Sequence, residues 1–250
     1  MTTEDIRKYV EGFLNDWAGG KSKDVCIYNE FSFQLELGKY LQGKISGYKV
    51  QFERNICDFF MSTENLKDDR RKIKKRFNKK EIDIVVFKGN NPWDAKEKYA
   101  IELKYIMPSD PTTDKMHEMI EDVSFIQQLI CDDKFKAKGE NTEIAPFNGA
   151  MAVTLCNIEN FYKNLCKNKN CDKCVIKKQY KEELLSQPTR YNIFQTRTDN
   201  CENMGNKYNE QKDKKTEWKY IKSTGKEVSV NPFCVEWKDL SNNYKYYIVE

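Results

Sequence analysis

The chain has 250 residues, which suits one medium-sized domain or a domain with an appendage. Hydrophobic residues make up 39% and charged residues 33%, and no stretch has the length and apolarity of a transmembrane segment, so we expect no membrane partner. The net charge is +4, and the acidic start at residues 1–5 lacks the order of a signal peptide, which predicts a cytoplasmic protein. Nine cysteines, an odd number, then indicate reduced thiols or metal ligands rather than a disulfide framework.

Two helices and a strand open the predicted order of elements. Residues 3–17 place apolar side chains at helical spacing, and Gly19-Gly20 ends that helix. Residues 29–42 form a second helix, which ends near Gly43. Residues 48–56 alternate well enough for a strand, and we place it at the first position of the sheet.

A strongly basic segment follows. Residues 67–80 contain nine Lys or Arg and two Asp, a local charge of +7, so the rest of the chain sums to −3. Release of counterions from phosphates is a physical reason for such a segment, although a charge run by itself is as often a solvated loop or helix face. The candidates for contact with a nucleic-acid backbone are Arg70, Arg71, Lys72, Lys74, Lys75, Arg76, Lys79 and Lys80.

Two strand-length apolar runs carry charge at positions that should be buried. Residues 81–87 contain Asp83, and residues 99–105 contain Glu102 and Lys104. A buried carboxylate needs a partner, a proton or a metal ion, and Mg²⁺ prefers oxygen ligands. Lys104 shares a strand face with Glu102, where it could orient or deprotonate a metal-bound water. The alternative is a surface ion pair of little consequence.

The remaining elements of the first half complete an α/β order. Pro108 and Pro111 end the second charged strand, and residues 114–131 form an amphipathic helix. His117, the only histidine, is expected at the surface or a helix end, without a catalytic role. Residues 150–156 form another buried strand. The order helix, strand, strand, strand, helix, strand fits an α/β sandwich with a mixed sheet.

Asp83 followed by Glu102-x-Lys104 resembles the signature of the PD-(D/E)XK, or restriction-endonuclease-like, nuclease superfamily. Residues 29–35 resemble the first core helix of that family, and residues 125–129 resemble the helix after the lysine strand. The resemblance covers residues 25–157, about half of the chain. Ile82 stands where the family name has proline, a departure that many branches share.

The resemblance implies a restriction-endonuclease-like core and a Mg²⁺-dependent deoxyribonuclease, with Mn²⁺ as a possible substitute. It implies that Asp83, Glu102, Glu30 and the main-chain carbonyl of Leu103 hold the metal ion and that Lys104 assists catalysis. Glu36 is a rival to Glu30 on the same helix, and Gln127 and Gln128 are possible accessory residues.

Other functions stay open from the sequence. A nuclease of this kind could belong to restriction, defence or recombination and repair, and it could act on RNA or branched DNA. It could also be an inactive module that binds nucleic acid or another protein. A homodimer is plausible because many nucleases that cut both strands dimerise.

The sequence divides into a core at residues 1–157, with the basic insertion at 67–80, and a helical, Cys- and Lys-rich extension at residues 158–250. Cys166, Cys171, Cys174 and Cys201 have spacing compatible with Zn²⁺ or, with Cys26 upstream, an iron–sulfur cluster. Cysteine-containing loops without metal are the alternative. Residues 233–237 and 244–249 predict a β-hairpin that extends the sheet or caps the tail.

Overall fold

The computed structural model describes ten parts of the chain: residues 1–22, 24–59, 75–110, 112–131, 135, 146–158, 218–221, 227–231, 233 and 235–250. Several sequence predictions lie outside these residues. They are the four basic residues Arg70, Arg71, Lys72 and Lys74, the cysteines Cys166, Cys171, Cys174 and Cys201, and most of the extension expected at residues 158–250.

A six-stranded mixed sheet forms the centre of the protein, in the order β1-β2-β3-β4-β8-β7. Its strands are β1 (Lys49–Asn55), β2 (Glu81–Lys88), β3 (Glu97–Ile106), β4 (Gly149–Cys156), β7 (Lys238–Asp239) and β8 (Lys245–Val249). Strands β3 and β4 run parallel, and the other neighbours are antiparallel. The predicted α/β class with a mixed sheet is confirmed, and β1 is the edge strand that the sequence predicted.

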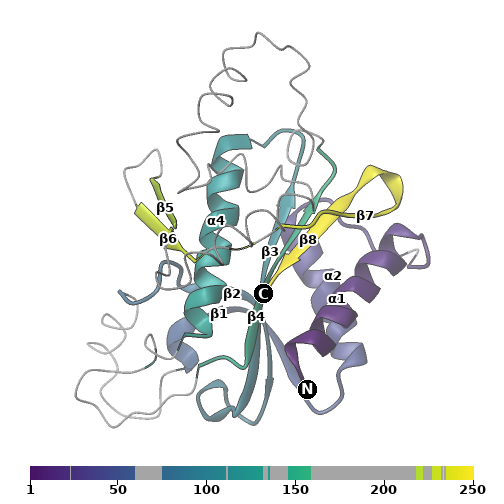
Figure 1. Cartoon of the computed structure of the whole chain (residues 1–250). Coiled ribbons are helices and arrows are strands. Elements are labelled where there is room, and N and C mark those ends of the chain that lie inside the picture. The colour runs from purple at the N-terminus through teal and green to yellow at the C-terminus, as the bar shows by residue number, and fades with distance from the viewer. Residues whose placement is uncertain are drawn as a thin grey trace, which may run out of the picture.

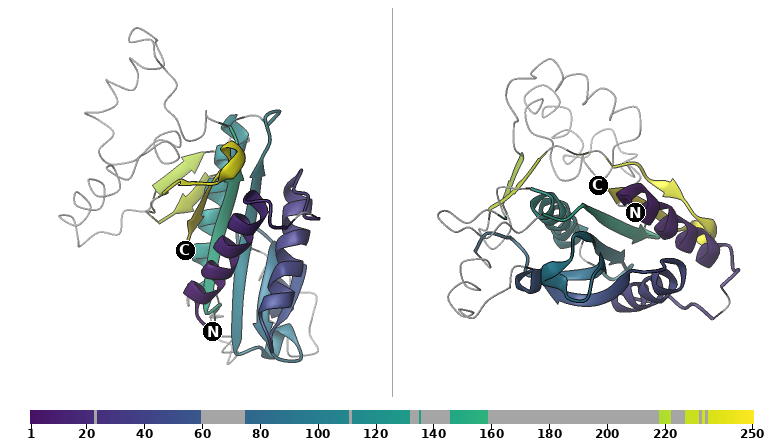
Figure 2. Two further views of the ribbon diagram at one scale, coloured as in Figure 1. Left: turned by 90° about the vertical axis from the view of Figure 1, so that its right-hand side faces the viewer. Right: turned by 90° about the horizontal axis from the view of Figure 1, so that it is seen from below.

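Helices cover both faces of the sheet (Figures 1 and 2). Helices α1 (Thr3–Ala18) and α2 (Glu30–Lys44) lie on one face, and α4 (Thr112–Leu129) lies on the other. The separate hairpin of β5 (Trp218–Ile221) and β6 (Glu227–Val230) packs beside α4. Short 3₁₀ turns occupy η1 (Ile56–Phe59), η2 (Pro92–Asp94) and η3 (Ser241–Asn243).

Strand alternation divides the core between the two faces. In β2, Ile84 and Val86 pack with α1 and α2, whereas Val85 and Phe87 pack with α4. Helix α2 comes close to β1 at Gly38, where an added Cβ would lie 2.0 Å from the ring of Phe52. This close approach fixes α2 against β1 where Phe52 pairs with Ile84 of β2.

The C-terminal hairpin differs in part from its prediction. It extends the sheet as predicted, because β8 pairs with β4. The expected first arm at residues 233–237 is wrong, since the strand paired with β8 is Lys238–Asp239. Phe233 and Val235 are instead buried among the side chains on the α4 face, and this packing takes the place of strand pairing. His117 is also buried, 6% exposed, rather than on the surface.

Lys98 is a buried lysine whose ammonium lies 5.7 Å from the ring centroid of Phe147. Burial lowers the pKa of Lys98 to about 8. In the unfolded chain, Lys98 stays protonated to a higher pH than in the folded protein. Burial of the charged form therefore lowers the free energy of unfolding in full below pH 8, and this loss shrinks as the pH rises to the unfolded pKa. We expect Lys98→Met to raise the free energy of unfolding by roughly 1–3 kcal/mol at pH 7. Urea denaturation at pH 7 and pH 10 checks this, and an equal gain at both values would contradict it.

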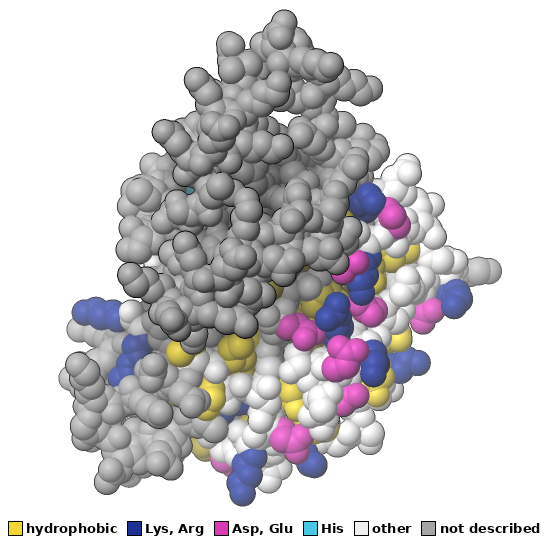
Figure 3. Space-filling model, in the orientation of Figure 1, with side chains coloured by type: hydrophobic (Ala, Val, Ile, Leu, Met, Phe, Trp, Pro, Cys, Tyr) yellow, Lys and Arg dark blue, Asp and Glu magenta, His cyan; other side chains and the backbone are white. Residues whose placement is uncertain are grey.

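The surface carries charges of both signs. On the face in Figure 3, Lys or Arg side chains are interspersed with Asp or Glu over the described part of the molecule. The two chain ends lie side by side, and Arg7 contacts Glu250 at 3.5 Å. None of the helices formed by the described residues combines the length and the apolarity needed to cross a membrane.

Candidate active site

The site lies where β2 and β3 separate. Their pairing begins at Lys88 and Glu97 and ends at Ile84 and Ile101. Beyond this point the N–H of Leu103 donates to Asp83 Oδ2 at 2.7 Å, and the N–H of Tyr105 donates to a second carboxylate. Carboxylates therefore take the place of the strand partner that β3 loses.

Glu30 is the second carboxylate at this fork. Its Oε2 accepts a hydrogen bond from the N–H of Tyr105 at 3.2 Å. Glu30 is the first residue of α2, and Asn29 caps the helix by accepting from the N–H of Ser32 at 2.8 Å. The cap fixes the start of α2 at the fork. Glu36, the rival candidate, pairs instead with Lys39 at 3.0 Å.

Lys104 connects β3 to one helix on each face of the sheet, α2 and α4. Its ammonium lies 3.1 Å from Glu30 Oε2, 3.4 Å from Glu118 Oε2 and 3.7 Å from Asp122 Oδ2. Burial lowers the pKa of Lys104, but Asp122, Glu30 and Glu118 together outweigh burial and hold that pKa above its usual value. Lys104 is therefore a protonated cation, able to donate hydrogen bonds and stabilise negative charge.

Lys79 is a second cation in the same cluster. Its ammonium lies 2.5 Å from Glu102 Oε2 and 2.7 Å from Asp122 Oδ1. Burial lowers the pKa of Lys79, and the nearby carboxylates raise it further than burial lowers it. Glu102 is fully buried, and both burial and the charge of Asp83 raise its pKa.

Asp122 is a site residue that sequence reasoning missed. It lies on α4, is 4% exposed, and contacts both Lys79 and Lys104. Its position three residues after Met119 and four before Ile126 places it on the apolar face of the helix. The sequence did contain a signal for Asp122, because a carboxylate on an apolar helix face is as unusual as the carboxylates on the two apolar strands.

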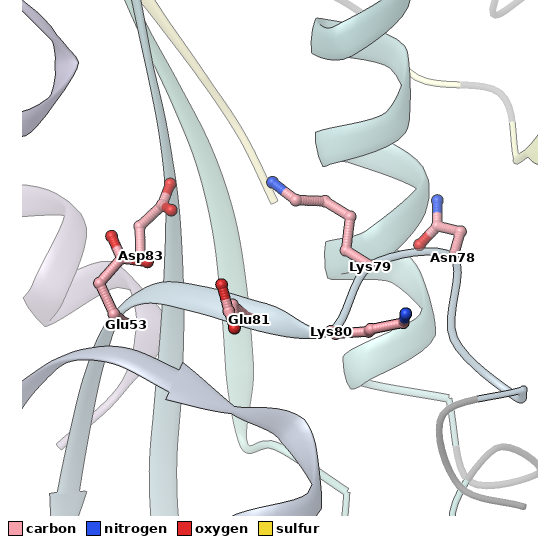
Figure 4. Close-up of a pocket in the computed structure, with 6 residues that line it drawn as sticks. All are labelled: Glu53, Asn78, Lys79, Lys80, Glu81 and Asp83. Atoms are coloured by element: carbon pink, nitrogen blue, oxygen red, sulfur yellow. The ribbon is translucent and has the colours of Figure 1, made fainter. Parts of the chain in front are cut away.

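Asp83 also borders an open pocket of about 340 Å³, whose lining is shown in Figure 4. Glu53 of β1 projects beside Asp83 there, from a backbone with a left-handed φ of 49°. Gln34 of α2 joins the two residues, since its amide donates to Glu53 Oε1 at 2.7 Å and to the main-chain oxygen of Asp83 at 2.6 Å. Glu53 and Gln34 were not predicted from the sequence.

Burial raises the pKa of Asp83 to about 7, although Lys79 and the N–H of Leu103 oppose the rise. A raised carboxyl pKa means that ionisation costs stability above pH 7 and costs nothing below the unfolded value near 4. We expect Asp83→Asn to stabilise the protein in EDTA by roughly 1–3 kcal/mol at pH 8 and not at pH 4, because the amide oxygen can still accept from Leu103. Denaturant unfolding at the two pH values measures this, with the exposed Asp239→Asn as control. A gain that does not depend on pH would contradict the assignment.

Other predicted residues are placed as follows. Lys75 and Lys80 are exposed, and Arg76 is half-buried, on the segment that leads into β2. Gln127 bonds the backbone of Asn231, and Gln128 accepts from the N–H of Asn78 at 3.0 Å, next to Lys79. The structure therefore places neither glutamine on the carboxylate cluster itself. Cys26 is exposed and has a free thiol.

The donor set of this site fits a hard divalent cation. Asp83 and Glu102 provide carboxylate oxygens, and Glu102 Oε1 is buried without a hydrogen-bond partner among the residues that the structure describes. Within the described residues, no three Asp, Glu, His or Cys side chains already converge as a metal cage. The ammonium of Lys79 occupies Glu102 Oε2, and the N–H of Leu103 occupies Asp83 Oδ2.

Comparisons of the chain with protein-family models, with curated proteins and with solved structures found no match. Functional conclusions therefore depend on the geometry of this site.

Proposed function

We propose that the protein is a metal-dependent nuclease of the restriction-endonuclease-like fold that hydrolyses phosphodiester bonds in DNA. The observation that carries the proposal is the convergence of Asp83, Glu30 and Lys104 at the fork between β2 and β3, with Glu102 beside them through Asp122 and Lys79. From the sequence, Asp83, Glu102 and Lys104 were linked by a short motif and Glu30 by its helix.

The chain's residues take distinct roles in this proposal. Asp83, Glu102 and the carbonyl of Leu103 hold Mg²⁺ or Mn²⁺, with Glu30 in support. A bound ion of this kind lowers the pKa of a water ligand and neutralises charge on a phosphate. Lys104 orients the attacking water and stabilises the negative charge that develops on the phosphate oxygens. Glu30, Glu118 and Asp122 keep Lys104 charged and in place.

A nucleic-acid substrate is favoured by the surroundings of the site. The basic segment that ends at Lys80 leads directly into β2, so cations lie next to Asp83. Tyr28 and Phe31 flank Glu30 in the sequence and are 63% and 65% exposed, and exposed aromatic rings can stack on bases. DNA is the proposed substrate, and RNA or branched DNA are tested beside it.

The test uses purified protein with plasmid DNA, linear duplex, branched DNA and RNA, each in Mg²⁺, in Mn²⁺ and in EDTA. We expect cleavage of DNA that needs the metal ion and stops in EDTA. Gel filtration with light scattering measures whether the active species is the expected homodimer. Binding of nucleic acid without cleavage in either metal would overturn the nuclease and favour a binding module of the same fold.

A further inference from the structure

The ammonium group of Lys79 occupies the cation position beside Glu102. Its Nζ contacts Glu102 Oε2 at 2.5 Å and Asp122 Oδ1 at 2.7 Å, so one cation joins β3 to α4. At such distances the carboxylate oxygen has no room for a divalent ion on the same side. Two cations placed together there would also repel each other strongly.

The same two carboxylates are only half satisfied. Glu102 Oε1 and Asp122 Oδ2 are buried and accept no hydrogen bond within the described part of the chain, and the ammonium of Lys104 lies 3.7 Å from Asp122 Oδ2. Buried charged oxygens without partners are costly. The two carboxylates therefore keep oxygens that a cation other than Lys79 could bind.

The side chain of Lys79 also has open space beside it. Its side chain is 28% exposed and borders the open pocket beside Asp83 (Figure 4). Residues 75–80, which carry it, form no helix or strand, and they continue the basic segment expected to meet phosphates. The ammonium group can leave Glu102 through the pocket without disturbing the sheet.

We propose that Lys79 is an internal counterion that competes with the divalent cation for Glu102, and that a nucleic-acid phosphate relieves this competition by binding Lys79. The inference builds on the proposed nuclease function. By thermodynamic linkage, nucleic acid then raises affinity for the metal ion and the metal ion raises affinity for nucleic acid by the same factor. The site is weak toward metal until substrate arrives.

The first test measures Mn²⁺ binding by the electron paramagnetic resonance signal of the free ion. Without nucleic acid, Lys79→Met is expected to bind Mn²⁺ about 10-fold more tightly than the parent, within the usual range of such couplings. Lys88→Met, a change to an exposed lysine at the far end of β2, is expected to leave the affinity unchanged. A nuclease-resistant phosphorothioate duplex should tighten Mn²⁺ binding to the parent and have little further effect on Lys79→Met.

The second test needs no variant, so it stands even if Lys79→Met does not fold. Acetic anhydride labelling with mass spectrometry follows the reactivity of Lys79 in the parent protein, and saturating Mn²⁺ should raise it several-fold while Lys80 stays unchanged. Equal Mn²⁺ affinity in the parent and Lys79→Met, or labelling that ignores Mn²⁺, would overturn the competition. Metal-dependent cleavage with either of those results would leave the nuclease proposal standing and remove this one alone. Competition between Lys79 and Mn²⁺ without cleavage of any substrate would remove the nuclease proposal and leave the competition itself standing.

Discussion

Lys104→Met is expected to lower metal-dependent cleavage by about 10³-fold, within the range of 10²–10⁴ for the loss of a positioned proton-transfer or charge-stabilising group. The substitution keeps an unbranched side chain that is one atom shorter and removes its charge. The variant would lack the ammonium group that contacts Glu30, Glu118 and Asp122 in the parent. Single-turnover cleavage of a labelled duplex measures the rate, and fluorescence anisotropy in Ca²⁺ measures binding, which should persist.

The same substitution should cost stability, because Asp122 is buried while the two glutamate side chains are about 40% exposed. We expect a loss of roughly 1–3 kcal/mol after allowance for solvent screening at the glutamates. Lys104→Arg keeps the positive charge, so it should fold almost as well as the parent and still cleave poorly, since a planar guanidinium cannot reproduce the contacts of an ammonium. Lys88→Met is the matched control, an exposed lysine at the far end of β2. Cleavage by Lys104→Arg and Lys104→Met at the parental rate would remove Lys104 from the mechanism.

The strands around the site were predictable because their signal is local. Residues 81–87 and 99–105 are strand-length apolar runs without Gly or Pro, and the observed strands are Glu81–Lys88 and Glu97–Ile106. The helix start at Glu30 was equally local, since Asn29 and Ser32 form its cap. The presence of Asp83, Glu102 and Lys104 on these strands therefore followed from residue order alone.

The contacts inside the site depend on long-range geometry that periodicity does not encode. The separation of β2 from β3 beyond Ile84 brings Glu30 to the N–H of Tyr105, across 75 positions of sequence. Lys79 was expected to meet phosphate, and its partners in the structure are Glu102 and Asp122. The pairing of β8 with β4 likewise joins residues about 90 positions apart, so the sequence predicted the hairpin but not its neighbour.

Asp122→Ala is expected to have the largest effect on stability, with a loss of roughly 2–4 kcal/mol, because two lysines would lose the one buried carboxylate that they share. Lys79 would keep Glu102 as its partner, and Lys104 would keep two half-exposed glutamates. Thermal and denaturant unfolding measure the loss. Glu36→Ala is the matched control, since Glu36 pairs with Lys39 on the same helix, and it should change stability by less than about 0.5 kcal/mol.

Asp122 touches both site lysines, so it should also act as a positioning residue for cleavage. Asp122→Asn keeps the size of the side chain and can still accept from Lys79, so it should fold better than Asp122→Ala. We expect it to lower kcat by about 10-fold or more with KM nearly unchanged, because Lys104 loses one of its three carboxylate neighbours. A purely structural role would lower the amount of folded enzyme without changing kcat per folded molecule. Active-site titration therefore separates the two roles, and an unchanged kcat in folded Asp122→Asn would limit Asp122 to stability.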